Sequence, residues 1–115
     1  RRAADQADAA SPLVALVHPV GTAFSCAIAT GFADGNPYDG IPFGQVDLWT
    51  YDQYHASAAG YYLETLTIFA GVTGKDPRTL GRTERAAAEL GLSPELATKV
   101  QDVAWTVTRP GATCG

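Results

Sequence analysis

The sequence predicts an α/β fold in which helices dominate when the chain is considered alone. Most of it consists of helical stretches bounded by capping residues, glycine and proline. One short run, residues 13–17, is apolar at every position, which is typical of a central strand in a parallel sheet covered on both faces. A single strand cannot satisfy its own backbone, and no second run of comparable strength follows. We therefore expect the partner strands to lie in another polypeptide segment.

Composition limits the function classes. The chain has 115 residues, of which 46% are hydrophobic and 17% charged, and this balance indicates a small globular domain instead of a disordered segment. The net charge is −4 and the basic residues are scattered, which argues against a nucleic-acid partner. No apolar run approaches the length needed to span a membrane, so we expect no membrane span.

The start of the chain indicates a fragment. The sequence contains no methionine, so we expect it to be cut from a longer precursor by signal removal or deeper processing. It opens on a helical stretch that no capping residue precedes. Residues 1–115 are therefore expected to form a single partial domain, in which residues 83–115 are a helical C-terminal extension.

Helices are expected on both sides of the apolar run. The first should end near Ala10, where Ser11 and a proline break it. Thr22 is predicted to cap a second helix, which ends before Gly31. A long ordered loop, residues 34–44, follows.

The loop is dense in glycine, proline, asparagine and aspartate, which is typical of turns. Calcium is a less favoured reading, because the spacing of Asp34, Asn36 and Asp39 misses the helix–loop–helix pattern and no bidentate glutamate follows. Residues 45–51 are predicted to be extended, with Trp49 and Tyr51 on the same side.

The second half of the chain is predicted to be helical. Ser57 should cap a helix that Gly74 ends, and Thr83 should cap another over residues 84–90. Ser93 should cap the last helix, with Pro94 at its first position. An apolar stripe on that helix indicates packing and consists of Leu96, Val100, Val103 and Val107.

The two cysteines leave two interpretations open. Cys26 and Cys114 are compatible with one disulfide that ties the C-terminal tail to the first half of the chain. They are equally compatible with two independent thiols, one of them packed as a small hydrophobe. A disulfide would indicate an oxidising compartment, and so a secreted or periplasmic protein. A cytoplasmic location stays open at this point.

The residues that suggest chemistry are Asp52 and His55, which lie three positions apart in a short turn before a helix. A carboxylate beside one imidazole nitrogen fixes the tautomer of the ring and stabilises the imidazolium that forms when the other nitrogen takes a proton. Such a pair is the acid–base half of a hydrolytic triad. The alternative is a local turn in which the carboxylate caps the backbone or pairs with a surface histidine.

The run Asp52-Gln53-Tyr54-His55, followed by a serine-capped helix with Gly60 near its start, resembles the last sequence block of the SGNH (GDSL-like) serine hydrolases. The surrounding segments 36–41, 48–49 and 73–78 are similar to one branch of that family, and the resemblance spans about residues 13–81. It implies the C-terminal half of a three-layer α/β/α, flavodoxin-like domain that hydrolyses esters, including carbohydrate esters, with no cofactor. His55 would be the general base and Asp52 the group that orients it.

The nucleophile that this resemblance requires has no counterpart here. Ser25 precedes a cysteine inside a predicted helix, whereas Ser11 and Ser57 fit a helix break and a helix cap. The family's nucleophile turn lies at the start of its domain. We therefore expect the serine to come from an N-terminal chain or segment of the same hydrolase domain, and this chain to be inactive alone.

Other candidate roles compete with packing. Trp49 and Tyr54 are candidate substrate-binding residues, but an aromatic cluster is more often core. His18, at the end of the apolar run, is expected to pack. Two histidines and two cysteines at no metal-like spacing predict no metal site. Two rival functions stay open, namely a mostly helical binding or structural module and a degenerate hydrolase domain that binds carbohydrate.

Overall fold

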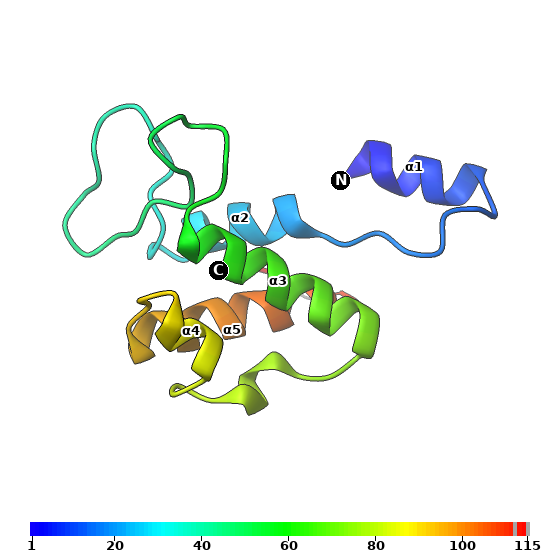
Figure 1. The fold of residues 1–115 in the computed structure, drawn as a ribbon. Helices are drawn as coiled ribbons and strands as arrows, with labels where there is room; N and C mark the ends of the chain where they lie inside the picture. Colours follow the sequence, from blue (N-terminus) through cyan, green and yellow to red (C-terminus); the bar gives the residue numbers. More distant parts are fainter. Residues whose placement is uncertain (112, 115) are drawn as a thin grey trace.

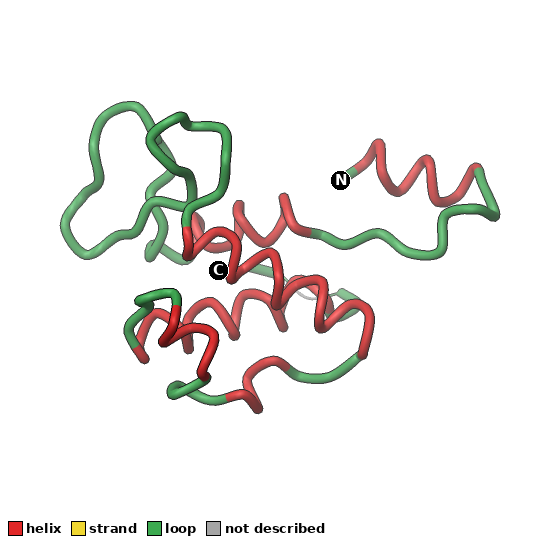
Figure 2. Tube along the Cα trace, in the orientation of Figure 1, coloured by secondary structure: helices red, strands yellow, loops and turns green. Residues whose placement is uncertain are grey.

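A computed structural model describes residues 1–111, 113 and 114. The elements in chain order are α1 (Arg2–Ala10), α2 (Val20–Ala29), α3 (Ala58–Thr73), the 3₁₀ turn η1 (Pro77–Leu80), α4 (Arg85–Glu89) and α5 (Pro94–Thr108). No strand is found within these described residues, where bridge pairing is limited to Ala33 with Val46 and Trp49 with Ala56 (Figure 2). The prediction that helices dominate is confirmed.

The core lies where α2, α3 and α5 pack against one another (Figure 1). Ala27 of α2, Leu63 of α3 and Val100 of α5 are all completely buried. The predicted stripe on α5 is confirmed, because Val100 and Val103 are buried and Leu96 and Val107 pack against the core. Since α5 supplies part of the central core, the C-terminal third of the chain is integral to the fold.

Helix α3 begins and ends as predicted. The Ser57 hydroxyl accepts a hydrogen bond from the Gly60 backbone N–H at 3.2 Å, which satisfies one of the free donors of the first turn. Gly74 follows the last turn with φ 68°, a left-handed conformation that glycine adopts without steric cost. The lack of a side chain at Gly60 is also required, because a Cβ there would collide with the Leu48 carbonyl oxygen. This close approach holds the preceding loop against the start of α3.

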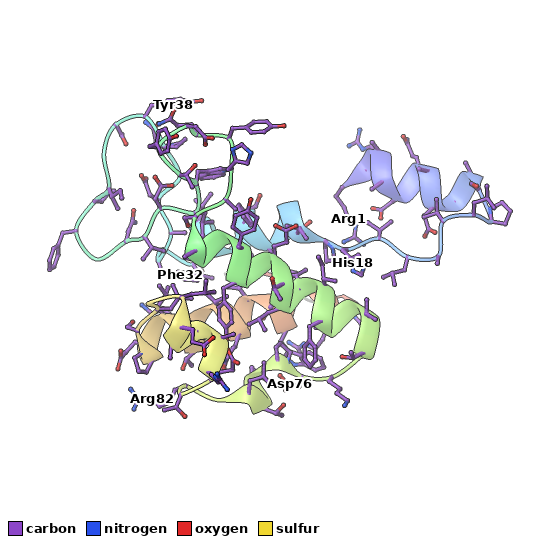
Figure 3. The ribbon with its side chains drawn as sticks, viewed as in Figure 1. Arg1, His18, Phe32, Tyr38, Asp76 and Arg82 are labelled. Atoms are coloured by element: carbon purple, nitrogen blue, oxygen red, sulfur yellow. A yellow bond between two sulfur atoms is a disulfide. The ribbon has the colours of Figure 1, made fainter. Side chains whose placement is uncertain are left out.

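The strand predicted over residues 13–17 is wrong for this chain. The segment is extended after a turn, joins α1 to α2 along the outside of the molecule (Figure 1), and leaves the Leu13 side chain 92% exposed. A strand is defined by its backbone pairing, and nothing among the described residues pairs with this segment. His18, at its end, packs against α3 beside Gly71 (Figure 3), in agreement with its predicted packing role.

Two predicted helix caps are also wrong. Helix α2 begins at Val20, so Thr22 lies within its first turn and Pro19 occupies the cap position with φ −82°. The fixed φ of proline lets the helix start directly after it. Helix α4 is capped by Glu84 instead of Thr83, because the Glu84 carboxylate accepts hydrogen bonds from the backbone N–H groups of Ala86 and Ala87, both at 2.9 Å.

The prediction that Trp49 and Tyr51 share a side is wrong as well. Trp49 packs edge-on against Phe24, with ring centroids 5.7 Å apart, whereas Tyr51 is 93% exposed. The chain turns immediately after Trp49, so the alternation of an extended strand does not continue to Tyr51.

A disulfide joins Cys26 on α2 to Cys114 near the C-terminus, across 88 positions of sequence. The disulfide interpretation of the two cysteines is therefore confirmed. Among the described residues, no helix has both the length and the apolar character needed to cross a membrane.

Candidate acid–base site

The candidate site lies on a short loop held at the N-terminal end of α3. Bridge pairing of Trp49 with Ala56 closes the loop, and the Thr50 N–H donates to the His55 carbonyl oxygen at 2.8 Å. The Ser57 hydroxyl donates to the Asp47 carbonyl oxygen at 2.7 Å while it caps α3. Residues 50–55 therefore form a closed turn at the start of α3.

Within this turn the structure brings Asp52 and His55 together. The His55 Nδ1 atom lies 2.6 Å from Asp52 Oδ2, which is hydrogen-bond distance. The His55 side chain is 62% exposed and that of Asp52 is 34% exposed, so the pair is open to solvent. An ionised carboxylate can only accept, so Nδ1 carries the proton in a neutral ring and Nε2 carries the lone pair. No hydrogen-bond partner of Nε2 occurs among the described residues.

The second oxygen of Asp52 is fully engaged. Its Oδ1 atom accepts from the Thr50 hydroxyl at 2.6 Å and from the backbone N–H groups of Tyr54 and His55, both at 2.9 Å. The His55 side chain, the Thr50 hydroxyl and these two N–H groups together hold the pKa of the Asp52 carboxyl well below its ordinary value. The carboxylate thus stays ionised and can stabilise positive charge on the ring.

The candidate substrate-binding aromatics are divided between core and surface. The Tyr54 ring is 82% exposed and meets the His55 ring edge-on, with centroids 5.0 Å apart. Trp49 is half-buried against Phe24 and belongs to the packing of the loop on α2. None of the main cavities among the described residues is lined by Asp52, His55, Trp49 or Tyr54, and the most apolar one, about 440 Å³, lies between α3 and α4.

The serines do not form a nucleophile beside His55. The Ser57 hydroxyl is committed to the α3 cap and to the Asp47 carbonyl oxygen. Ser25 lies on α2 and lines a cavity next to the disulfide. Ser11, after α1, accepts from the Leu13 N–H.

The other polar clusters have structural roles. In the loop after α2, Asp34 Oδ1 accepts from the Asn36 N–H at 3.1 Å, and Asn36 Oδ1 accepts from the Tyr38 N–H at 3.2 Å. These are turn-forming bonds of the kind that the composition indicates. Across the described part of the chain, no group of three or more His, Cys, Asp or Glu side chains is placed to hold a metal ion.

Sequence reasoning missed Thr50. Its hydroxyl makes one of the shortest contacts in the turn, yet only its position two residues before Asp52 could have indicated this. Threonine and serine hydroxyls form such local bonds often, so that spacing alone does not single out a site.

The low pKa of Asp52 predicts a dependence of stability on pH. Its ordinary value is 3.8, so the unfolded chain takes up this proton before the folded one as the pH falls. The carboxylate's stabilising contribution is therefore complete above about pH 3.8 and is lost as the pH falls through the lower folded pKa. Urea unfolding at several pH values should show wild type losing stability relative to Asp52→Asn in this acid range. Parallel curves for the two proteins would contradict the assignment.

Comparison with known proteins gives no relative: no family model matches the sequence, and no curated protein or solved structure matches it either.

Proposed function

We propose that this chain supplies the acid–base pair of a serine hydrolase that acts on ester bonds, including carbohydrate esters, and that the serine comes from another polypeptide segment of the same domain. The observation that carries the proposal is the 2.6 Å contact between His55 Nδ1 and Asp52 Oδ2 on a ring whose Nε2 atom is free to meet a nucleophile. The resemblance of this turn to the last block of the SGNH hydrolases supports the same reaction class.

In the proposed reaction, His55 Nε2 takes the proton from the serine hydroxyl as that oxygen attacks the ester carbonyl carbon. His55 then returns the proton to the leaving alcohol, which departs and leaves the serine acylated. Water, deprotonated by His55, next attacks the acyl-enzyme, and the acid is released as the serine takes the proton back. Asp52 holds the ring through Nδ1 and stabilises its charged form. Loss of a single oxyanion donor costs about 3 kcal/mol of transition-state stabilisation. Without a nucleophile or oxyanion donors, the chain alone is inactive.

The surface around the pair supports a covering polypeptide. The loops of residues 34–55 expose large apolar side chains, and Phe43, Tyr51 and Tyr54 are each more than four-fifths exposed. Tyr51 and Tyr54 lie in the same turn as the pair, where exposed aromatic side chains are available as contacts for a partner. A covering segment would supply the cleft wall that is missing beside His55.

The apolar segment of residues 13–17 supports the same conclusion. It is extended, and its backbone pairs with no strand among the described residues. A second polypeptide packed along this segment would cover exposed side chains such as Leu13 and Leu16.

The rival function is a non-catalytic, mostly helical binding or structural module. The lack of a main cavity at the pair favours this module, in which Asp52 would serve only to close the turn. The two functions differ in whether a serine becomes reactive in the presence of His55.

A fluorophosphonate probe distinguishes them, because it labels only an activated serine. The protein should be isolated from its native source under non-denaturing conditions, labelled, and analysed by intact mass spectrometry. We expect label on a co-purifying polypeptide with a Gly-Asp-Ser turn, and none on this chain. Label on this chain would refute the claim that its nucleophile lies elsewhere. A lone, unlabelled chain would favour the binding module.

A further inference from the structure

We infer that Thr50 is a positioning residue of the Asp52–His55 pair, acting through the Asp52 carboxylate. This inference deepens the proposed function and rests on it for its catalytic meaning, whereas its geometry stands alone. The Thr50 hydroxyl donates to Asp52 Oδ1 at 2.6 Å, and Asp52 Oδ2 lies 2.6 Å from His55 Nδ1. The three side chains therefore form a continuous chain of hydrogen bonds.

The two carboxylate oxygens have separate tasks. Oδ1 accepts three hydrogen bonds, from the Thr50 hydroxyl and from the N–H groups of Tyr54 and His55. Within the described part of the chain, Oδ2 accepts only from the ring. We infer that these three donors restrain rotation of the carboxylate and so keep Oδ2 at Nδ1. A carboxylate held only by the two N–H groups could rotate and weaken the bond that sets the tautomer of His55.

Thr50 is itself held by the turn that it supports. Its N–H donates to the His55 carbonyl oxygen at 2.8 Å, and its carbonyl oxygen accepts from the Gln53 N–H at 2.9 Å. Gln53 has φ 55°, the sole positive value at a non-glycine position in the described part of the chain. Such strained residues persist where surrounding contacts over-determine them, and they cluster at functional sites. The Thr50 hydroxyl is one of those contacts.

The experiment compares Thr50→Val, which removes the hydroxyl at nearly constant shape, with Thr50→Ser, which keeps it. Nitrogen-15 NMR of the His55 ring reports the tautomer, and carbon-13 NMR of the Asp52 carboxyl reports its titration midpoint. We expect Thr50→Val to lower the population of the Nδ1–H tautomer and to raise the Asp52 midpoint toward its ordinary value. Thr50→Ser should restore both signals. These readouts need neither a partner polypeptide nor turnover.

Amide exchange at Thr50 and His55 shows whether the turn is intact in each variant. An intact turn in Thr50→Val with unchanged ring and carboxyl signals would overturn the inference. If Thr50→Val loosens the turn, the test passes to Thr50→Ser, which keeps the hydroxyl. An intact turn with an altered His55 tautomer in Thr50→Ser would also overturn the inference.

A last comparison separates this inference from the proposed function. In the assembled hydrolase, Thr50→Val should lower kcat/KM by about tenfold or more, as loss of a partner that orients a functional histidine does elsewhere. Thr50→Ser should restore the rate. Altered NMR signals with unchanged turnover would leave Thr50 as the positioning residue and refute the catalytic role of the pair.

Discussion

Replacing His55 with alanine is expected to lower the turnover of the assembled hydrolase by at least about 10⁴-fold, since the base of a triad acts as a unit with its nucleophile. The loss should appear in kcat, because in the proposed mechanism His55 moves protons in the transition state and does not hold the substrate. The fluorophosphonate label on the partner should fall in parallel. Steady-state kinetics on a chromogenic ester would measure the effect.

His18 provides the matched control. It is the second histidine of the chain, and it packs against Gly71 of α3, away from the turn that holds Asp52. His18→Ala should leave kcat within severalfold of wild type in the fraction that folds. Because the His55 side chain is 62% exposed, free imidazole should reach the space that His55→Ala leaves and partly restore turnover. Unchanged kcat in His55→Ala would refute the role of the residue.

Loss of the Cys26–Cys114 disulfide is expected to lower the free energy of unfolding by about 4–5 kcal/mol, from the entropy of closing a loop over 88 positions. Small domains commonly have about 5–15 kcal/mol in total, so the loss is a large fraction of the stability. Cys114→Ala is the better variant, because Cys26 is 2% exposed in the core and its replacement would also disturb packing. Urea unfolding with and without reductant measures the effect.

The control for this prediction is the reductant itself. Dithiothreitol should lower the unfolding midpoint of wild type to that of Cys114→Ala and should leave the variant unchanged. A wild-type midpoint that does not respond to a reductant shown by mass to have opened the bond would contradict the prediction. Disulfides of this kind persist in oxidising compartments.

The helical part of the fold was predictable because its signals are local. Ser57 and Gly74 bound α3, and Ser93 with Pro94 starts α5, through bonds that involve residues within one turn. The caps at Thr22 and Thr83 were wrong because a proline and a glutamate near them compete for the same position. The strand at residues 13–17 was wrong because pairing is a long-range property that one run of apolar residues does not determine.

The candidate site was predictable in part for the same reason. Asp52 and His55 lie in one turn, so a spacing of three residues was enough to predict their contact. The structure gives that contact a distance of 2.6 Å. The burial of Trp49 and the exposure of Tyr51 depend on how the loop meets Phe24 of α2, which adjacent sequence does not encode. The Thr50 contact is local, but its residue type is too common in turns to indicate a function.

Helix α1 has no buried residue and reaches the rest of the molecule through the extended segment of residues 11–19 (Figure 1). Helix α1 itself therefore contributes little apolar burial to the packing of α2, α3 and α5. Residues 16–18 do contact α3, since Leu16 and His18 both lie against Gly71. In the proposed assembly, a covering polypeptide would displace α1 at little cost in buried apolar area, because none of its residues is buried.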